Sequence, residues 1–515
     1  MKRMKSNPFA LMIASFLTLI AAGVGFGVRA GVLGIWGAKF EFTNLELGTI
    51  TGGGLTGFGL VVLVASLITD RIGYKTIVLS ALVLHVLSAG ITFAATPIYA
   101  SAGKDATYMC LYLGMFMFAV ANGLCEAAIN PLIAQLYPNQ KTHYLNILHA
   151  GWPGGLILGG ILAGSFLGPN AWVMQLRWEI PMALFLIPTV IYGIITLREH
   201  FPESEVKAAG ITFAQGVMEF AQPLLLFLLV LQVCVGYVEL GTDSWITRIM
   251  NRFLIGQGFI LFIYASSIMF VLRFFAGPIV ARINPLGLLF TSAVLATIGL
   301  YSIGTFETAV AIWIAVTIYG IGKTFFWPTM LGVVGERFPR GGAMTIGAVS
   351  AVGALSGGYL GGPGIGYQQD FYATQNLQQV SPETYQRYQA EEENGFLFLP
   401  PVRGLNGARV AVLDDEGKEL ATDVERWTSS GNKLEDNSAL AALNQWWQGA
   451  SQYTKVDAQP VNAASIFGAK MALRWTSCVP AAMAGGYLIL ILYFRLRGGY
   501  RQVEMSVTDN AAPTE

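Results

Sequence analysis

Long apolar runs separated by short polar segments make up most of the chain. A helix needs about 20 apolar residues to cross a bilayer, and it satisfies its own backbone hydrogen bonds there. Twelve runs approach or exceed that length, so the pattern predicts an all-α membrane protein with twelve transmembrane helices. The predicted spans are residues 9–38, 45–68, 76–96, 108–136, 143–167, 179–197, 222–248, 256–281, 286–304, 309–334, 342–362 and 474–496.

Two polar segments divide this array. The first separates two pseudo-symmetric halves of six spans each, and the second separates span eleven from span twelve. We expect the second to be a small insertion outside the membrane. The expected parts are an N-terminal half 1–197, a cytoplasmic linker 198–221, spans seven to eleven in 222–367, the insertion 368–472, span twelve in 473–497 and a cytoplasmic tail 498–515.

The insertion carries local signals of its own. SPETYQRYQAEEE predicts a short amphipathic helix capped by Ser381. In ARVAVLDDEGKELATDVER, alternating Val410 and Val412 before a turn at 415–417 predict a β-hairpin. No nucleophile–base set or metal cluster stands out in the segment, so we interpret it as an appendage and do not expect an enzyme.

Positive charges orient the chain, because cytoplasmic loops carry an excess of Lys and Arg. With the N-terminus inside, fourteen such residues fall in inner segments and five in outer short loops. We therefore expect both termini in the cytoplasm and a multi-pass protein of the plasma membrane, the inner membrane in a bacterium. The apolar run after MKRMK continues past Gly31, which favours a first span over a signal peptide.

Composition agrees with a protein that lies in lipid. Of the 515 residues, 54% are hydrophobic and 12% charged, whereas soluble domains carry about 25% charged residues. Lys+Arg and Asp+Glu balance at 31 each, so no nucleic-acid surface is indicated. The four cysteines lie in apolar runs without metal-type spacing, and we interpret them as packing residues. We expect no cofactor, no metal and a monomer.

Spans four and ten repeat one pattern: Glu126 and Lys323 each precede a proline, Pro131 or Pro328, by five residues. Parallel halves of this kind suit alternating access to a site between them. No ATP-binding P-loop is visible, so transport would draw on a gradient rather than on hydrolysis within this chain.

Residues 66–75, SLITDRIGYK, resemble the signature between spans two and three of the major facilitator superfamily. The matching positions are Asp70, Arg71, Gly73 and Lys75. The resemblance implies a tight cytoplasmic turn and a gating role, in which Asp70 pairs with basic groups in one conformation and releases them in another.

Asn122, Glu126 and Asn130 form one polar stripe on span four, and Asn146 and His149 continue it into span five. CEAAINPLIAQLYPNQKTHYLNILH resembles the fucose permease group of the superfamily. In that group, a Glu before Asn-Pro couples protons to sugar entry and an Asn in span five contacts the sugar. The resemblance gives these roles to Glu126 and Asn146 and covers the hydrophobic core, not the insertion.

One position departs from the group, which has an acid in span one where this chain has Arg29. Estimated depths in the membrane predict two cross-cavity pairs, Arg29 with Glu239 and, deeper, Glu126 with Lys323. A buried charge needs such compensation, because an unpaired one costs about 2.5–3.5 kcal/mol at mid-membrane. The alternative is that each charge pairs within its own half. Arg273 is interpreted as a structural or snorkelling residue, and His85 as a packing histidine.

These observations predict a secondary transporter for a sugar or similar small polar solute, coupled to protons. A sugar acid and a transporter-derived sensor remain alternatives. The expected proton-coupling residues are Glu126 and Glu239. The expected substrate-binding residues are Arg29, Glu126, Asn130, Asn146, His149, Tyr237, Glu239, Lys323 and Trp327.

Overall fold

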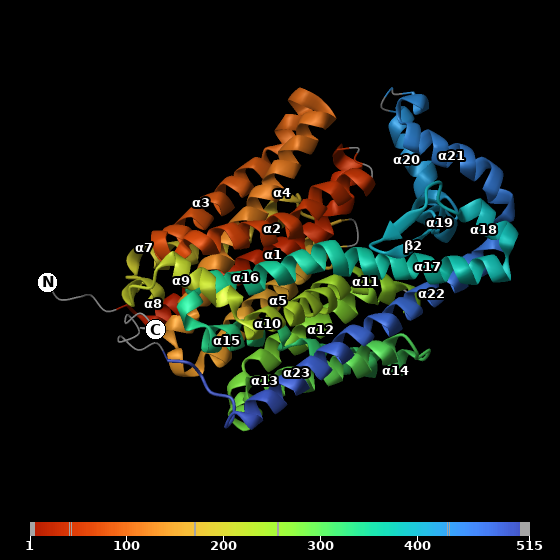
Figure 1. The fold of residues 1–515 in the computed structure, drawn as a ribbon. Coiled ribbons are helices and arrows are strands. Elements are labelled where there is room, and N and C mark those ends of the chain that lie inside the picture. Colours follow the sequence, from red (N-terminus) through yellow and green to blue (C-terminus); the bar gives the residue numbers. More distant parts are fainter. Residues whose placement is uncertain are drawn as a thin grey trace.

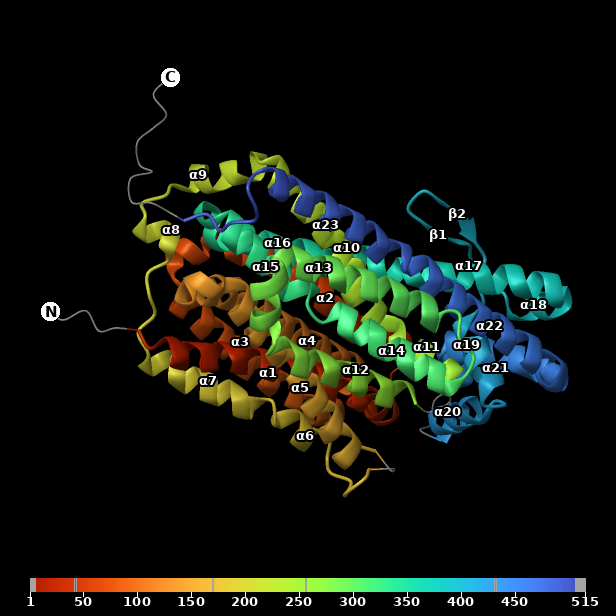
Figure 2. The same cartoon turned by 90° about the horizontal axis from the view of Figure 1, so that it is seen from below.

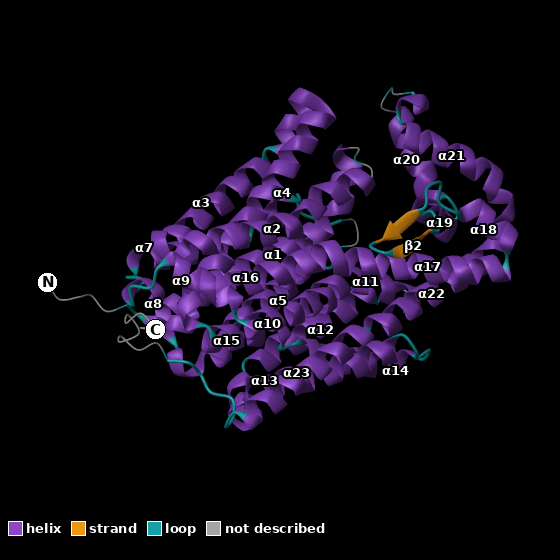
Figure 3. Ribbon diagram, in the orientation of Figure 1, coloured by secondary structure: helices purple, strands orange, loops and turns teal. Residues whose placement is uncertain are grey.

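The computed structural model describes residues 6–40, 42, 44–168, 171–254, 257–429, 431 and 433–504. Helices run lengthwise through the molecule, and the described strands form one small antiparallel pair (Figures 1 and 3). The helix α1 begins and α23 ends at the same end of the bundle, which we call the terminus end. Residues 381–453 project from the opposite end, the insertion end.

The first half contains six spans. They are α1 Pro8–Phe40, α2 Asn44–Ile72, α3 Tyr74–Phe93, α4 Ala95–Leu136, α5 Lys141–Phe166 after the 3-10 turn η1 Pro138–Gln140, and α6 Glu179–Ala183 continued by α7 Leu186–Arg198. The connection to the second half forms α8 Glu205–Ala208, α9 Phe213–Met218 and η2 Glu219–Ala221.

The second half is more interrupted. Its spans are α10 Pro223–Gly236, η3 Tyr237–Gly241 and α11 Thr242–Phe253; α12 Gly258–Arg273; α13 Ala276–Ile303; α14 Ala309–Lys323 with α15 Phe326–Arg337; η4 Pro339–Gly341, α16 Gly342–Ser356, η5 Gly357–Gly361 and α17 Gly362–Val380; and α22 Thr454–Thr476 with α23 Cys478–Leu496. Asn284 breaks α13 with φ 54°, so the ninth span starts there. Pi-helical turns form η3 and η5.

Among the described residues, ten helices are long and apolar enough to cross a membrane. The shorter apolar helix α12 and the glycine-rich α2 bring this to the twelve spans that the sequence predicts. Large apolar side chains such as Leu60, Val230 and Ile314 are exposed on the outside of the bundle. Such an apolar exterior is suited to lipid.

Close helix contacts depend on glycine. At Gly23 on α1 and Gly155 on α5, an added Cβ would meet the backbone of the other helix. Small residues of this kind let membrane helices approach closely. Between the halves, α5 packs on α12 and α2 packs on α16, so these two helix pairs connect the two bundles.

The insertion is largely helical, which overturns one prediction. The segment expected as a hairpin forms α19 Gly407–Asp414 and α20 Lys418–Ser429. Asn406 caps α19, its Oδ1 accepting from the N–H groups of Ala408 and Arg409 at 3.1 Å each. Val410 and Val412 are both buried, so their alternation reflects helix packing rather than a strand. The β-pair lies earlier, at β1 Asn394–Phe396 and β2 Leu399–Val402.

The rest of the insertion comprises α18 Pro382–Tyr388, η6 Leu434–Asp436, α21 Ser438–Ala450 and η7 Ser451–Tyr453. The helix α18 begins after Ser381 as predicted, although the Ser381 hydroxyl pairs with Thr384 Oγ1 at 2.7 Å rather than with the backbone. Helix α17 runs 18 residues beyond the predicted end of span eleven at 362, and α22 starts 20 residues before 474. These two extensions carry the insertion away from the bundle (Figure 1).

Candidate functional site

A cavity lies between the two halves at mid-bundle and contains about 790 Å³ of space free of protein atoms, part of it open to solvent. Both halves line it. The polar and aromatic lining residues are Thr18, Phe26, Phe58, Asn122, Glu126, His149, Trp152, Glu239, Arg273 and Trp327.

Glu126 of α4 lies at the contact between the halves. Its Oε1 accepts hydrogen bonds from Trp327 Nε1 at 3.3 Å and from Ser350 Oγ at 3.2 Å, both in the second half. His149 Nε2 lies 3.7 Å from the same oxygen and pairs at 2.9 Å with Asn130 Oδ1. Both of these donors belong to the opposite half, whereas His149 and Asn130 belong to the first, so relative movement of the halves changes the surroundings of Glu126.

Glu239 of η3 pairs with Arg273, whose Nη2 lies 3.3 Å from Glu239 Oε1. Glu239 Oε2 and Asn122 Nδ2 have no hydrogen-bond partner in the described part of the chain, and both residues line the cavity. The lining thus offers one buried acceptor and one buried donor. A hydroxyl group can satisfy both kinds, since it donates and accepts.

The predicted cross-cavity pairs are wrong in this structure. Lys323 forms an ion pair with Asp243, within the second half. The Arg29 guanidinium packs 3.6 Å from the centre of the Phe118 ring, and none of its nitrogens has a hydrogen-bond partner in the described structure. The alternative of pairing within one half holds for Glu239 and Lys323, because Arg273 and Asp243 also lie in the second half.

Depth along a helix does not give the direction in which a side chain points, which explains the error. Arg29 turns towards α4 and α7, where the Phe185 ring centre is 5.6 Å away. On the seventh span, the π-turn η3 changes the helical phase around Glu239, and π-turns often occur at functional sites. Neither feature is visible in a count of residues from the membrane edge.

The other predicted site residues lie at different distances from the cavity. His149 and Trp327 join Glu126 and Glu239 in the cavity lining. Asn130 and Asn146 are buried beside it: Asn146 Nδ2 donates to Thr329 Oγ1 of the second half at 3.1 Å. The Tyr237 hydroxyl lies beside Gly364, towards the insertion. Arg29 and Lys323 are not among the lining residues.

One feature of the cavity escaped the sequence analysis. Arg273 was interpreted as structural, yet it lines the cavity and pairs with Glu239. His85 is a buried packing histidine, as predicted, with Nε2 3.0 Å from Asn122 Oδ1 and Nδ1 2.9 Å from the Tyr192 hydroxyl. The available sequence signal is a pair of prolines, Pro153 and Pro328, each four residues after a carbonyl that Arg273 binds.

At the terminus end, the signature residues surround the contact between halves. Asp70 Oδ2 accepts from the N–H of Ala343 at 3.1 Å, at the start of α16. Asp70 therefore binds a helix N-terminus, where an anion is stabilised, rather than the basic side chain expected. Arg71 stacks on Phe213 of α9 at 4.8 Å, and Lys75 Nζ donates to the Leu197 and Glu199 carbonyls at 3.0 Å each. Gly73 makes the tight turn with φ 95°.

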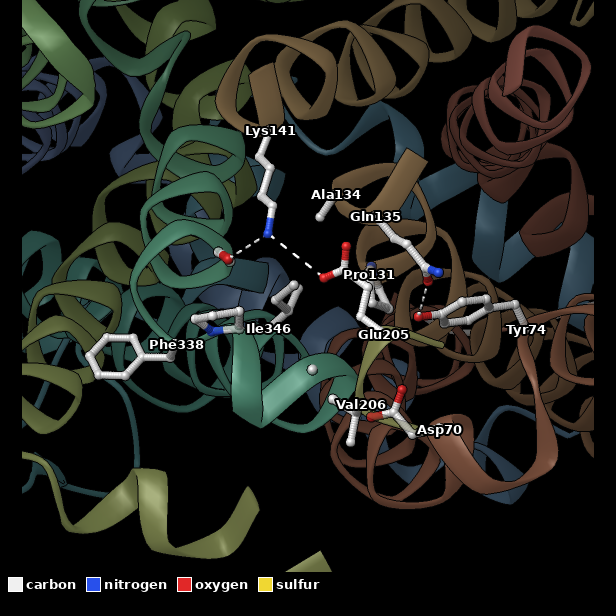
Figure 4. A pocket seen from close by; sticks show the side chains of 13 residues that line it. Asp70, Tyr74, Pro131, Ala134, Gln135, Lys141, Glu205, Val206, Phe338 and Ile346 are labelled. Carbon is white, nitrogen blue, oxygen red and sulfur yellow. Dashed lines mark hydrogen bonds and ion pairs between the residues drawn. The ribbon is translucent and has the colours of Figure 1, made fainter. Parts of the chain in front are cut away.

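Figure 4 shows a pocket beside this contact, where both halves and the linker meet. Lys141 Nζ of α5 donates to the Gly335 carbonyl at 3.1 Å and lies 4.0 Å from Glu205 Oε2 of α8. Thr142 Oγ1 donates to Glu336 Oε1 at 2.7 Å. These bonds hold the halves together at the terminus end. At the insertion end, Lys104 Nζ lies 6.0 Å from the Trp427 ring.

A comparison of the amino-acid sequence with models of known protein families gives the family of the chain. The model of the Major Facilitator Superfamily matches residues 11–361, about two thirds of the chain. The chain belongs to the Major Facilitator Superfamily. It is a multi-pass membrane protein with the fold of that superfamily's transporters.

Among curated superfamily members, the chain is 24% identical to the L-fucose-proton symporter of Escherichia coli over 164 residues, 32% of this chain and 35% of the symporter. It is 25% identical to the cis,cis-muconate transport protein of Acinetobacter baylyi over 160 residues, 31% of this chain and 36% of that protein. The match thus spans about a third of each relative's length.

Solved superfamily structures share the fold. The transporter FucP in the outward conformation has a TM-score of 0.55 at 19% identity, covering 70% of this chain and 91% of FucP. An inward-facing bacterial homologue of the human lysosomal transporter Spinster has a TM-score of 0.56 at 15% identity, covering 96% and 98%. At these identities the likeness concerns the fold.

Proposed function

We propose that the protein is a secondary transporter for a neutral, polyhydroxylated solute such as a monosaccharide, moved by alternating access and coupled to protons. The single observation that carries this proposal is the cavity lining. It combines Asn122 Nδ2 and Glu239 Oε2, both buried without a partner among the described residues, with the aromatic faces of Phe26, Trp152 and Trp327. The hydroxyl groups of a sugar can bond the two polar atoms, and the apolar faces of its ring can pack on the aromatic side chains.

Charge favours a neutral solute over a sugar acid. The cavity is lined by two carboxyl groups, Glu126 and Glu239, and by one arginine that Glu239 already pairs. Lys323 pairs with Asp243, and Arg29 packs on Phe118. A carboxylate solute would therefore meet an excess of negative charge. Arg273 is the observation that keeps the sugar acid as a second candidate.

Glu126 is the group that we propose carries the proton. Unlike Glu239, it has no Lys or Arg within ion-pair distance in the described structure. An isolated carboxylate inside a membrane is costly, so proton uptake relieves that cost. Because Trp327 and Ser350 belong to the other half, opening the terminus end would remove two donors that stabilise the ionised form.

The placement of the chain in the cell is part of this proposal. We propose a monomer in the plasma membrane, with the terminus end in the cytoplasm and the insertion outside. Residues 1–197 and 222–367 with 473–497 would then be the moving halves, and 198–221 the connection. The positive-inside bias of the sequence and the common position of α1 and α23 support this orientation.

Counterflow in proteoliposomes tests the proposal. Vesicles loaded with an unlabelled neutral sugar, from a panel that includes L-fucose and D-xylose, should accumulate the labelled form. D-glucuronate should give little or none. Protein-free vesicles control for leakage. Counterflow of the sugar acid alone would transfer the proposal to the second candidate, and counterflow of neither class would contradict it.

A further inference from the structure

Arg273, at the end of α12, joins three spans beside the cavity. Its Nε donates to the Thr324 carbonyl at 2.8 Å and its Nη1 to the His149 carbonyl at 2.6 Å. Its Nη2 lies 3.3 Å from Glu239 Oε1. The side chain is 2% exposed, so these protein groups replace its hydration. His149 belongs to the first half, whereas the other two partners belong to the second.

Both carbonyl groups lie four residues before a proline. In an α-helix, the carbonyl of residue i accepts from the N–H of residue i+4, and proline has no N–H. Pro153 in α5 therefore leaves the His149 carbonyl without its helical donor, and Pro328 in α15 does the same for Thr324. An unsatisfied carbonyl inside a membrane costs several kcal/mol. Arg273 supplies the missing donor at both proline bends.

The guanidinium is suited to this position because its donors lie in a rigid planar fork. A lysine presents a compact ammonium on a flexible chain and does not match three partners in fixed directions. Three acids and one further cation surround Arg273: Glu239 and Asp243 come from the seventh span, Glu126 from α4 and Lys323 from α14, with His149 on α5. Arg273 is thus held by geometry as well as by its charge.

We propose that Arg273 is a positioning residue for alternating access, which holds the proline bends of α5 and α14–α15 together and fixes the α5–α12 contact as a pivot between the halves. The inference rests on the proposed transport function but does not depend on which solute is carried. Hydrogen bonds at the terminus end, such as Thr142 to Glu336, must break when that end opens. The Arg273 contacts lie at mid-bundle, where a pivot moves least.

The test replaces the fork while keeping the charge, with Arg273→Lys. Spin labels at Ser101 and Glu307, on opposite halves, report the distance between the halves in a background carrying Cys234→Ser and Cys478→Ser. The inference expects R273K to lower turnover far more than it weakens binding of a transported sugar in a thermal-shift titration. It expects turnover to fall roughly 10-fold or more, the cost of a hydrogen bond to a charged group. It also expects the distances between the labels to form two separate populations in wild type and one broad population in R273K.

Pro153→Ala provides the matched second variant. It restores an N–H that can bond the His149 carbonyl, so the loss caused by R273K should be smaller in the P153A background. The P153A/R273K double variant also serves if R273K alone does not fold. Turnover of R273K within 2-fold of wild type, or equal losses in both backgrounds, would overturn the inference. Lost sugar binding with unchanged label distances would overturn it too, by making Arg273 a binding residue.

The label distances need no substrate. If wild-type protein carried no sugar, the proposed function would fail, and the comparison of R273K with wild type would still decide the pivot.

Discussion

Single residues in the cavity carry the coupling that we propose. Glu126 combines burial, 4% exposed, with donors from the opposite half. Its polar stripe was visible in the sequence, because Asn122, Glu126 and Asn130 recur at every fourth position. Its partners were not, since Trp327 and Ser350 are about 200 residues away along the chain. The sequence located the acid but could not show what surrounds it.

Replacing Glu126 by Gln should separate coupling from exchange. The amide keeps the size and one acceptor but cannot exchange a proton. We expect proton-driven accumulation of sugar to fall at least about 10²-fold, the lower range for loss of a proton-transferring group. Counterflow, which needs no net proton movement, should persist. Both are measured in the same proteoliposomes, with the exposed Glu307→Gln as control. Accumulation at the wild-type level in E126Q would rule Glu126 out as the proton carrier.

Arg273, which we propose as a positioning residue, illustrates the opposite case, because the sequence analysis interprets it as structural or snorkelling. Two of its partners are backbone carbonyls, which have no side-chain signature. Pro153 and Pro328 were the available signal, because each proline inside a span leaves the carbonyl four residues before it without a helical hydrogen-bond donor. In other membrane proteins, an arginine inside a span can therefore be examined as a donor for the carbonyl four residues before a proline in a neighbouring span.

At the level of elements, periodicity predicted the spans and missed what lies outside lipid. Twelve apolar runs became helices because lipid leaves the backbone no other partner. In the insertion, water removes that constraint, and side-chain packing decides. Leu413 and Val410 join Tyr388 and Val461 in a small core, which makes 407–414 a helix where alternation indicated a strand. The extensions α17 and α22 are too polar to be recognised as parts of spans.

The insertion should depend on one ion pair, between Arg387 and the buried carboxylate of Asp457. Arg387 Nε donates to Asp457 Oδ2 at 2.8 Å, and Thr384 Oγ1 donates to Asp457 Oδ1 at 2.8 Å. The hydrogen bond from Arg387 to Asp457 raises the pKa of Arg387 above its ordinary value. A hydrogen bond to a charged group contributes about 1.5–3 kcal/mol, so Asp457→Asn should speed amide exchange in α18–α21 by roughly tenfold or more.

The comparison for D457N is Glu416→Gln, which removes a surface pair with Lys418 worth about 0–1 kcal/mol. Hydrogen exchange by mass spectrometry should leave the protection of α1–α16 unchanged in both variants. If D457N exchanged like wild type, the insertion would not rely on this pair.

For the whole molecule, the structure corresponds to a state closed at the terminus end. The halves are joined there by Lys141 to Gly335, Thr142 to Glu336 and Asp70 to Ala343. These contacts connect residues about 200 or more positions apart, so the sequence could predict the gating signature but not which conformation it stabilises. Closure at this end is therefore a property of the two halves together and not of either half alone.

Closure should respond to pH through Glu205. Burial raises the pKa of this carboxyl group, and Lys141 partly opposes the shift. The protonated form therefore favours the closed state, fully so below the ordinary value of about 4.5, and the contribution is lost as pH rises through the raised pKa. Labelling of a cysteine at buried Ala134, on the pocket of Figure 4, measures opening. Labelling of the thiol itself speeds up as it ionises in both proteins, so the wild-type rate is divided by the Glu205→Gln rate at each pH, and this ratio should rise with pH. A parallel pH profile in E205Q would contradict this assignment.

The contact between Asp70 and the start of α16 provides the sharpest test of closure, because charge and hydrogen bond can be removed one at a time. An anion at a helix N-terminus contributes about 0.3–1 kcal/mol. Asp70→Asn keeps an acceptor and loses the charge, so labelling at Ala134→Cys should rise roughly 2- to 5-fold. Asp70→Ala loses both and should rise further. Glu203→Gln, a half-exposed acid in the adjacent connection, should leave the rate unchanged. Equal labelling in D70N and D70A would mean that charge, not the bond to Ala343, holds this end closed; wild-type rates in both would mean that the Lys141 and Thr142 bonds suffice.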